Sequence, residues 1–252
     1  MRPQQRQLKI IDILRRAGRV SVDELVAEFN ASAETIRRDL SVLASSGKIQ
    51  KVHGGALLPS NQQGEGPFQQ RMAENIAAKR FIAEKASKLI SAGDTLLIDT
   101  GSTTLIFAEE IAAIKDLTVI TNSVEIAKII ATVKNNSTVF LLGGEYHSDN
   151  RQTLGATLIA QLEQFHVQYA ILTVGSLNAQ VGAADFNIEE AVVARAMLQR
   201  ADNRILLVDS SKFNNAASFV LGKLNQFDQL VCEVEPDQVL KTALEEANVA
   251  LI

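Results

Sequence analysis

The amino-acid sequence predicts an α/β protein in two parts: a small, mostly helical N-terminal part and a larger part built on an open, mostly parallel sheet. Through residue 58 the apolar residues recur at helical spacing. From residue 76 onward, short runs rich in Val, Ile and Leu alternate with segments of helix length, which is typical of a sheet buried on both faces. Charge divides the chain at the same place. Residues 1–58 hold ten Lys and Arg against six Asp and Glu, whereas the remainder holds 15 against 23.

The first two helices are predicted from their ends. One covers residues 3–17, since its apolar residues share a face and Gly18 provides a helix stop. A second helix is expected to begin at residue 22, because Ser21 and Glu24 have the spacing of a capping box.

A third helix is expected after a short turn at residues 30–31, with Ser32 as its N-cap. Ile36, Leu40 and Leu43 repeat at i, i+4 and i+7, so they face the core. The same spacing turns the polar residues outward: Thr35, Arg37, Arg38 and Ser41. Two capped helices joined by a tight turn are the layout of a helix-turn-helix, whose second helix enters the major groove of DNA.

Residues 48–58 alternate like strands around Gly54-Gly55, which predicts a β-hairpin wing. Lys51 and His53 lie at its approach, where a winged helix meets phosphate or the minor groove. The basic charge of this part also suits double-stranded operator DNA as a partner. The DNA-contacting candidates are Ser32, Ala33, Glu34, Thr35, Arg37, Arg38, Lys51 and His53. Arg38 is alternatively a structural partner of Asp39 or Glu34.

Residues 59–67 are rich in turn formers and have no hydrophobic period, so a linker is expected there. Residues 68–75 are ambiguous, and Arg71 has either part as a possible contact. The predicted domains are therefore 1–58, a linker over 59–75, and 76–252.

The second part is expected to follow a βα alternation. Six strands are predicted by near-continuous apolar runs: 95–99, 117–121, 138–142, 169–174, 204–209 and 230–234. The helices between and around them are expected at 76–90, 103–113, 124–133, 154–165, 188–201 and 236–248.

Polar residues follow these strands, at the edge where open α/β sheets bind ligands. After the first strand, Asp99-Thr100-Gly101 leads into three hydroxyl residues and a helix N-terminus, which together predict an anion cradle for a phosphate. The effector-binding candidates on this edge are Asp99, Gly101, Ser102, Thr103, Thr104, Asn122, Ser123, Gly143, Gly144 and Lys212. Glu189 and Arg195 are either ligand contacts or a salt-bridged helix face, and the second interpretation is favoured.

Composition excludes several classes of protein. The one cysteine, Cys232, forms no internal disulfide and suits a reducing compartment as a small core residue. No apolar run approaches the roughly 18 residues of a membrane span, and no signal peptide is apparent. We expect a cytoplasmic protein without membrane contact. His147 and His166 lack metal-ligand spacing, so no metal or cofactor is expected.

The first 58 residues resemble the helix-turn-helix of the DeoR family of bacterial transcriptional repressors, in T-I-R-R-D-L at 35–40 and H-G-G-A at 53–56. The later residues are similar to the family's sensor domain in D-T-G-S-T-T at 99–104, T-N-S at 121–123, G-G-E at 143–145 and D-S-S-K-F at 209–213. The resemblance implies a repressor of a sugar-metabolism operon. It also implies release by a sugar phosphate or related metabolite, and a homo-oligomer, dimer or tetramer. One departure is Asn214-Asn215, where a glycine is common.

The sensor domain in turn resembles ribose-5-phosphate isomerase and glucosamine-6-phosphate deaminase, whose phosphate loop also reads T-G-S-T. Those enzymes need an acidic pair and a Lys-Gly-Gly run after the fourth strand, and residues 175–185 offer neither. We therefore expect no catalytic residues. Two alternatives remain: an isomerase or deaminase with an appended DNA-binding domain, and a second part that serves only oligomerisation.

Overall fold

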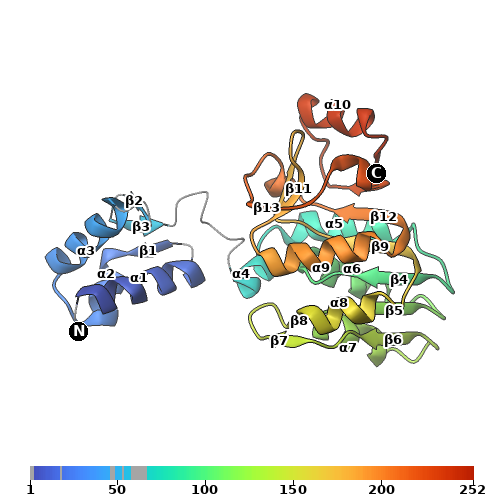
Figure 1. Cartoon of the computed structure of the whole chain (residues 1–252), viewed down its shortest axis with the longest axis horizontal. Helices are drawn as coiled ribbons and strands as arrows, with labels where there is room; N and C mark the ends of the chain where they lie inside the picture. The colour runs from blue at the N-terminus through green and yellow to red at the C-terminus, as the bar shows by residue number, and fades with distance from the viewer. Residues whose placement is uncertain (1–2, 18, 46–48, 53, 58–66) are drawn as a thin grey trace. The chain divides into compact units, whose positions relative to one another are not determined.

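The computed structural model describes residues 3–17, 19–45, 49–52, 54–57 and 67–252 (Figure 1). They form two compact units, Met1–Pro67 and Phe68–Ile252. Several sequence predictions fall outside the described residues, namely the helix stop at Gly18, the wing residues Lys48, His53 and Leu58, and most of the linker.

The N-terminal unit has three helices and a small antiparallel sheet with the strand order β1-β3-β2. The helices are α1 (Pro3–Ala17), α2 (Val22–Phe29) and α3 (Ala33–Ser45), and the strands are β1 (Arg19–Ser21), β2 (Gln50–Val52) and β3 (Gly55–Leu57). One apolar cluster, which includes Ile10, Leu14, Leu25, Ile36 and Leu40, fills its core. The three helices and the two wing strands are as predicted. β1 was missed because three residues are too few to show alternation.

Both predicted caps of the helix-turn-helix are present. The Glu24 N–H donates to Ser21 Oγ at 3.2 Å, and the Ser21 N–H donates to Glu24 Oε2 at 2.7 Å. Asn30 ends α2 in the left-handed conformation, with φ 46°. The Thr35 N–H then donates to Ser32 Oγ at 3.2 Å, which begins α3. The turn is therefore fixed by local hydrogen bonds.

The second unit is built on a seven-stranded sheet in which every neighbouring pair is parallel, so the predicted open parallel sheet is confirmed. Its order is β15-β14-β12-β9-β4-β5-β6. The strands are β4 (Thr95–Ile98), β5 (Thr118–Thr121), β6 (Thr138–Leu141), β9 (Val167–Leu172), β12 (Ala201–Leu207), β14 (Gln229–Val231) and β15 (Ala250–Leu251).

Helices cover both faces of this sheet (Figure 1). One face packs against α5 (Ile76–Ser87), α6 (Ser102–Ile111) and α7 (Val124–Thr132). The other packs against α8 (Ala156–Leu162), α9 (Ile188–Leu198) and α10 (Gln238–Glu246). Short 3-10 helices occur at η1 (Ser210–Lys212) and η2 (Leu224–Gln226). No helix in the described ranges is long and apolar enough to cross a bilayer.

Short antiparallel strands account for most differences from the sequence prediction. β7 (Glu145–His147) pairs with β8 (Gln152–Leu154), so the helix expected from 154 begins only at Ala156. A second small sheet joins β10 (Ser176–Asn178), β11 (Gly182–Asp185) and β13 (Phe219–Gly222). Strands of three or four residues are too short for a period to identify them.

Two other boundaries were also wrong. The helix expected over 188–201 ends at Leu198, and Ala201 already belongs to β12. The last helix begins at Gln238, because Asp237 Oδ1 accepts the Leu240 N–H at 2.9 Å and acts as the N-cap.

The predicted linker over 59–75 is too long at its C-terminal end. Residues 68–73 form helix α4 (Phe68–Ala73), which belongs to the second unit. Phe68 is 5% exposed and joins the apolar cluster under α5 and α6. One helical turn and a half has too few apolar residues to be recognised from the sequence.

The tip of the wing needs both of its glycines for different reasons. Gly54 has φ +78°, and a Cβ there would meet nothing within 4 Å. A Cβ on Gly55 would instead lie 2.2 Å from the Val20 carbonyl oxygen of β1. Gly55 thus lets β1 and β3 approach, while Gly54 makes the turn.

We predict that Gly55→Ala lowers the free energy of unfolding of the N-terminal unit by about 1–3 kcal/mol, because the added methyl must push β1 and β3 apart. Gly54→Asn is the control and should cost less than about 1 kcal/mol, since asparagine tolerates a positive φ. Urea unfolding of the full chain, followed by circular dichroism, measures both. Equal effects of the two substitutions would contradict the close approach at Gly55.

Candidate functional site

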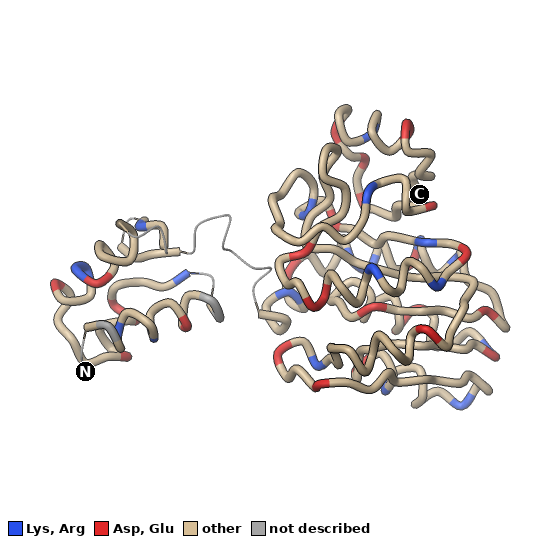
Figure 2. The backbone as a smooth tube through the Cα atoms, viewed as in Figure 1, with Lys and Arg blue, Asp and Glu red and all other residues tan. Residues whose placement is uncertain are grey.

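The exposed side of α3 carries the predicted DNA-contacting residues. Ile36, Leu40 and Leu43 are buried, while Arg37 and Arg38 are exposed as predicted. The remaining α3 candidates differ, because Glu34 is exposed whereas Ala33 and Thr35 are half-buried. The Thr35 hydroxyl also lies 2.9 Å from the Ser32 hydroxyl, so these two side chains are partly engaged in capping. Figure 2 shows basic and acidic residues interspersed along this unit.

A hydrogen-bonded chain joins the wing to α3. Lys51 Nζ, on β2, donates to Ser41 Oγ at 3.0 Å, and Ser41 Oγ donates to the Arg37 carbonyl at 2.8 Å. Lys51, Ser41 and Arg37 are all exposed, so the structure brings two predicted DNA contacts to one face. Ser41 was recognised as outward-facing but was not counted as a candidate. His53 lies outside the described residues.

The alternative interpretation of Arg38, in which it pairs with Asp39 or Glu34, is wrong. Asp39 is only 4% exposed, and its carboxylate accepts from Arg6 Nε at 2.5 Å and Gln7 Nε2 at 2.9 Å. This buried pair ties α1 to α3. Within the described residues, no ion pair joins Arg38 to Asp39 or Glu34, and Arg38 is left on the exposed face.

In the second unit, the sheet reverses its strand order between β4 and β9. Ligands of open α/β sheets bind at this switch point, outside the carboxyl ends of the strands. The Asp99 N–H donates to the Ile171 carbonyl at 3.0 Å, so pairing extends one residue past β4. A Cβ on Gly101 would lie 2.2 Å from Thr173 Cγ2. With glycine at position 101, the loop after β4 packs against the Thr173 side chain of the loop after β9 without either having to shift.

The loop after β4 is also bonded to the loop after β5. The Thr100 N–H donates to both Asp99 Oδ1, at 2.8 Å, and Asn122 Oδ1, at 3.1 Å. The Thr100 hydroxyl donates to the same Asn122 oxygen at 3.0 Å. Asp99, Asn122 and Gly101 therefore come together, as the sequence predicted.

The hydroxyl candidates divide into two groups. Thr104 donates to the Gly101 carbonyl at 3.1 Å, and Ser123 Oγ accepts the Ile126 N–H at 3.3 Å, so both have structural hydrogen bonds. Ser102 and Thr103 lie in the first turn of α6, and in the described part of the chain their hydroxyls make no hydrogen bond. These two are the better-placed anion ligands, because the N–H groups of that first turn are themselves donors.

The remaining candidates lie farther from β4 or have structural roles. The Gly143 N–H donates to Gln161 Oε1 at 2.9 Å, and a Cβ on Gly144 would lie 2.3 Å from the Leu154 carbonyl oxygen. Both glycines thus shape the entry into the β7–β8 hairpin. Lys212 lies in η1 beyond β12, which is two strands from β4. Asn214 follows with φ 57°, so it adopts the conformation for which glycine is usual.

Two carboxylates at this edge were missed. Asp99 is 8% exposed, and its pKa is raised well above the usual value by burial, then by the charge of Glu190 and, more weakly, that of Asp185. The hydrogen bond from the Thr100 N–H and, more weakly, the nearby Asn122 amide oppose that shift in pKa. Glu190 and Asp185 reach Asp99 from α9 and β11, and no spacing in the sequence indicates this. Asp99, Asp185 and Glu190 are thus three carboxylates from separate segments that interact at this edge.

Glu190 is the centre of a polar network. Its Oε1 accepts from Asn150 Nδ2 and from Gln152 Nε2, each at 2.7 Å. Asn150 Oδ1 accepts from Arg71 Nη2 at 2.9 Å. Arg71 is 8% exposed, and its guanidinium lies 5.4 Å from the centre of the Phe68 ring. The open question of which part Arg71 contacts is thereby answered: it belongs to the second unit.

Glu189 and Arg195 do not form the favoured salt-bridged face. Glu189 is exposed, and Arg195 donates to the Val220 carbonyl instead; across the described ranges no ion pair joins the two. In the same ranges no three His, Cys, Asp or Glu side chains gather as metal ligands. Cys232 is buried in the core as expected, and burial raises the pKa of its thiol to about 11.

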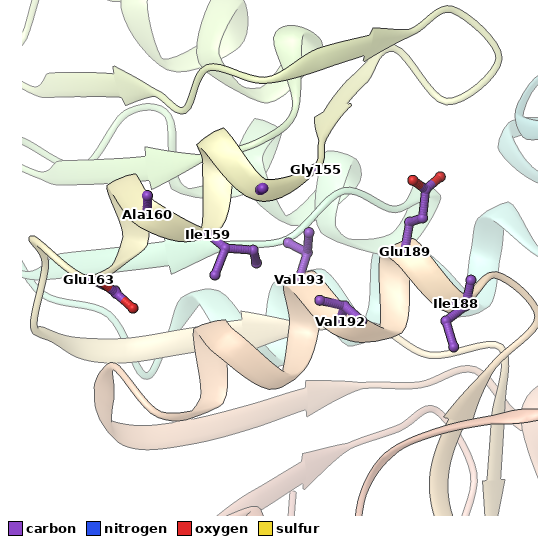
Figure 3. A pocket seen from close by; sticks show the side chains of 9 residues that line it. Gly155, Ile159, Ala160, Glu163, Ile188, Glu189, Val192 and Val193 are labelled. Atoms are coloured by element: carbon purple, nitrogen blue, oxygen red, sulfur yellow. The ribbon is translucent and has the colours of Figure 1, made fainter.

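A pocket of about 470 Å³ lies between α8 and α9 (Figure 3). It is lined by Gly155, Ala156, Ile159, Ala160, Glu163, Ile188, Glu189, Val192 and Val193. The side chains that face it are mostly apolar and include none of the predicted effector-binding residues. The switch point, with its converging polar groups, remains the candidate site.

Comparison with known proteins matches both units. Residues 6–62 match the DeoR-like helix-turn-helix domain, and residues 74–234 match the DeoR C terminal sensor domain. The chain is 31% identical over 251 residues to the glycerol-3-phosphate regulon repressor of Escherichia coli (strain K12), covering 100% of this chain and 99% of that protein. It is 29% identical over 252 residues to the HTH-type transcriptional repressor GlcR of Bacillus subtilis (strain 168), covering 100% and 96%.

Similarity to solved structures is weaker. A D-ribose-5-phosphate isomerase in complex with phospho-erythronic acid overlaps 54% of this chain and 52% of that chain, with a TM-score of 0.40 and 17% identity. Similarity at this level carries no conclusion about activity. The two matching domains follow one another along the chain, and relatives at about 30% identity span its whole length. The chain therefore belongs to the DeoR family of helix-turn-helix transcriptional regulators.

Proposed function

We propose that the protein is a repressor of an operon for sugar or sugar-derivative metabolism, which binds operator DNA and is released by a phosphorylated sugar or related metabolite. The observation that carries the proposal is the pair of unpaired hydroxyls, Ser102 and Thr103, at the N-terminus of α6 on the switch point. Two relatives, a glycerol-3-phosphate regulon repressor and the transcriptional repressor GlcR, support this class of function.

The DNA-contacting surface is the exposed side of α3 together with the wing. Arg37 and Arg38 supply charge from α3, and Lys51 supplies it from β2. The hydrogen bonds through Ser41 hold Lys51 beside the Arg37 backbone, so helix and wing present one basic face. A pseudo-palindromic operator would require at least a dimer. We propose a homo-oligomer, dimer or tetramer, that acts in the cytoplasm, where its DNA lies.

The effector site is the anion cradle at the switch point, and it works without catalysis. Ser102, Thr103 and the first N–H groups of α6 bind the phosphate. Gly101 keeps the cradle narrow, because it lies against Thr173. The proposal of no catalysis rests on the sequence after β9, where residues 175–185 hold neither a Lys-Gly-Gly run nor an adjacent Asp-Glu pair.

Release of DNA requires that the effector bind the free conformation more tightly than the DNA-bound one. The first helix after the linker is connected to the site by hydrogen bonds. Asn122 O accepts the Thr153 N–H at 2.9 Å on β8, and the neighbouring Gln152 contacts Glu190. From Glu190 the network continues through Asn150 to Arg71 on α4. We propose that this network transmits effector binding to the linker.

Arg37→Ala is expected to weaken operator binding about tenfold and to lower the slope of log affinity against log salt by about one. The reason is the loss of one phosphate or base contact without any loss of core packing. Fluorescence anisotropy with the DNA upstream of the protein's own gene, at matched salt, measures both. Arg80→Ala, a matched change at an exposed position on α5, is the control. An unchanged affinity for the Arg37 variant would remove Arg37 from the DNA surface.

Ser102→Ala combined with Thr103→Val is expected to raise at least tenfold the concentration of sugar phosphate that releases DNA, because two phosphate ligands are lost. Thr132→Ala removes an exposed hydroxyl on α7 and should change nothing. The same anisotropy assay is run across phosphorylated pentoses, hexoses and hexosamines. An intact response in the double variant would contradict the cradle, and turnover of any of these compounds would favour the enzyme alternative.

Arg71→Met is expected to uncouple the two units. The variant should bind sugar phosphate within about threefold of wild type by isothermal titration calorimetry, whereas DNA release should need at least ten times more effector. Gln70→Ala, an exposed position on the same helix, is the control. Coupled losses of effector affinity and release would show that Arg71 acts on the site itself.

A further inference from the structure

A buried donor at the switch point is unused by the fold. The Asn122 side chain is fully buried, and its Nδ2 makes no hydrogen bond in the described structure. Its other atom, Oδ1, accepts twice from Thr100, which fixes the orientation of the amide. Leaving a buried donor unpaired costs free energy, so such a group indicates a binding partner.

The free amide group lies beside the Asp99 carboxyl. Both side chains converge on the Thr100 N–H, at 2.8 Å for Asp99 Oδ1 and 3.1 Å for Asn122 Oδ1. The amide is close enough to lower the pKa of Asp99, although Nδ2 reaches no oxygen with hydrogen-bond geometry. The other Asp99 oxygen, Oδ2, accepts no hydrogen bond of normal geometry from any described residue. A donor and an acceptor thus lie side by side, directly before the anion cradle.

The surroundings select among ligand groups. An ammonium group has donors only, so it leaves Asn122 Nδ2 unpaired. A carboxylate accepts from Nδ2 but meets the negative charges of Asp99 and Glu190, which already disfavour one another. A hydroxyl group accepts one hydrogen bond, donates another and carries no charge. Of these three groups, the hydroxyl alone satisfies both atoms.

We propose that Asp99 and Asn122 form a hydroxyl-binding subsite next to the phosphate cradle, where a hydroxyl of the effector accepts from Asn122 Nδ2 and donates to Asp99 Oδ2. The effector is then a polyhydroxy phosphate. Phosphates that carry an amine or a carboxylate in place of this hydroxyl are excluded from the subsite. Glu190 acts as a positioning residue, held by Asn150 and Gln152. This inference rests on the phosphate cradle of the proposed function.

The test compares phosphates that share one anionic group and differ in the rest. Isothermal titration calorimetry of the full chain gives dissociation constants for inorganic phosphate, propyl phosphate, glycerol 3-phosphate, glucitol 6-phosphate, phosphoethanolamine and 3-phosphonooxypropanoate, the last two of which carry no hydroxyl on carbon. The polyol phosphate that binds best should bind at least tenfold more tightly than propyl phosphate, and the amine and carboxylate compounds should show no such advantage. An advantage below about threefold overturns the subsite while phosphate binding keeps the cradle. Binding of none of the compounds overturns the proposed effector site, and the subsite with it.

Two isosteric variants test whether the preference for the polyol phosphate depends on Asp99 Oδ2 and Asn122 Nδ2. Asp99→Asn replaces the acceptor by a donor, and Asn122→Asp replaces the donor by an acceptor while keeping the oxygen that Thr100 needs. Each should reduce the advantage of the polyol phosphate over propyl phosphate by about tenfold. Because both compounds share the phosphate, the ratio cancels the effect of changed charge on the cradle. Asp202→Asn, at an exposed position near the start of β12, is the matched control. A ratio unchanged in both variants overturns the assignment.

Discussion

The close approach of Gly101 to Thr173 is the constraint on which the sensor unit depends. It brings the loop after β4 against the loop after β9, at the one place where the strand order reverses. Any side chain at position 101 would meet the Thr173 methyl group, so either that side chain or the loops would have to shift. A shift of the loops would move the first turn of α6 relative to Asp99 and Asn122, which both accept the Thr100 N–H.

In the N-terminal unit, backbone groups and short polar side chains likewise fix the geometry. The Ser21–Glu24 capping box and the Ser32 cap set the angle between α2 and α3. The buried pair of Arg6 and Asp39 then attaches α1 to α3. A buried ion pair contributes little net stability, because desolvation offsets the attraction, but its geometry is specific. The exposed arginines therefore lie on a helix, α3, whose position is fixed by its N-cap and by its ion pair with α1.

Sequence reasoning recovered what depends on neighbouring residues. Caps, helical spacing and apolar runs located the helix-turn-helix and the six main strands, and polar strand ends located Asp99, Gly101 and Asn122. It failed where a contact joins distant segments. Glu190 reaches Asp99 from another helix, and Arg71 reaches Asn150 across 79 positions, so neither leaves a local pattern. The sequence also does not show which hydroxyls are already hydrogen-bonded within the protein. Thr104 and Ser123 make local hydrogen bonds, whereas Ser102 and Thr103 make none to the described residues.

The polar groups that form the candidate site also connect it to α4, so they offer a route by which ligand binding could act on the start of the second unit. Asn122 contacts the loop after β4 through its side chain and β8 through its carbonyl, so a ligand that orders one would act on the other. From β8 to α4 every step is a side-chain hydrogen bond of 2.7–2.9 Å between groups that are at least partly buried. Such bonds are either made or broken, because a buried polar group without a partner is costly. A network of this kind favours two alternative arrangements over a continuous deformation, and that is the property an effector needs in order to shift DNA affinity.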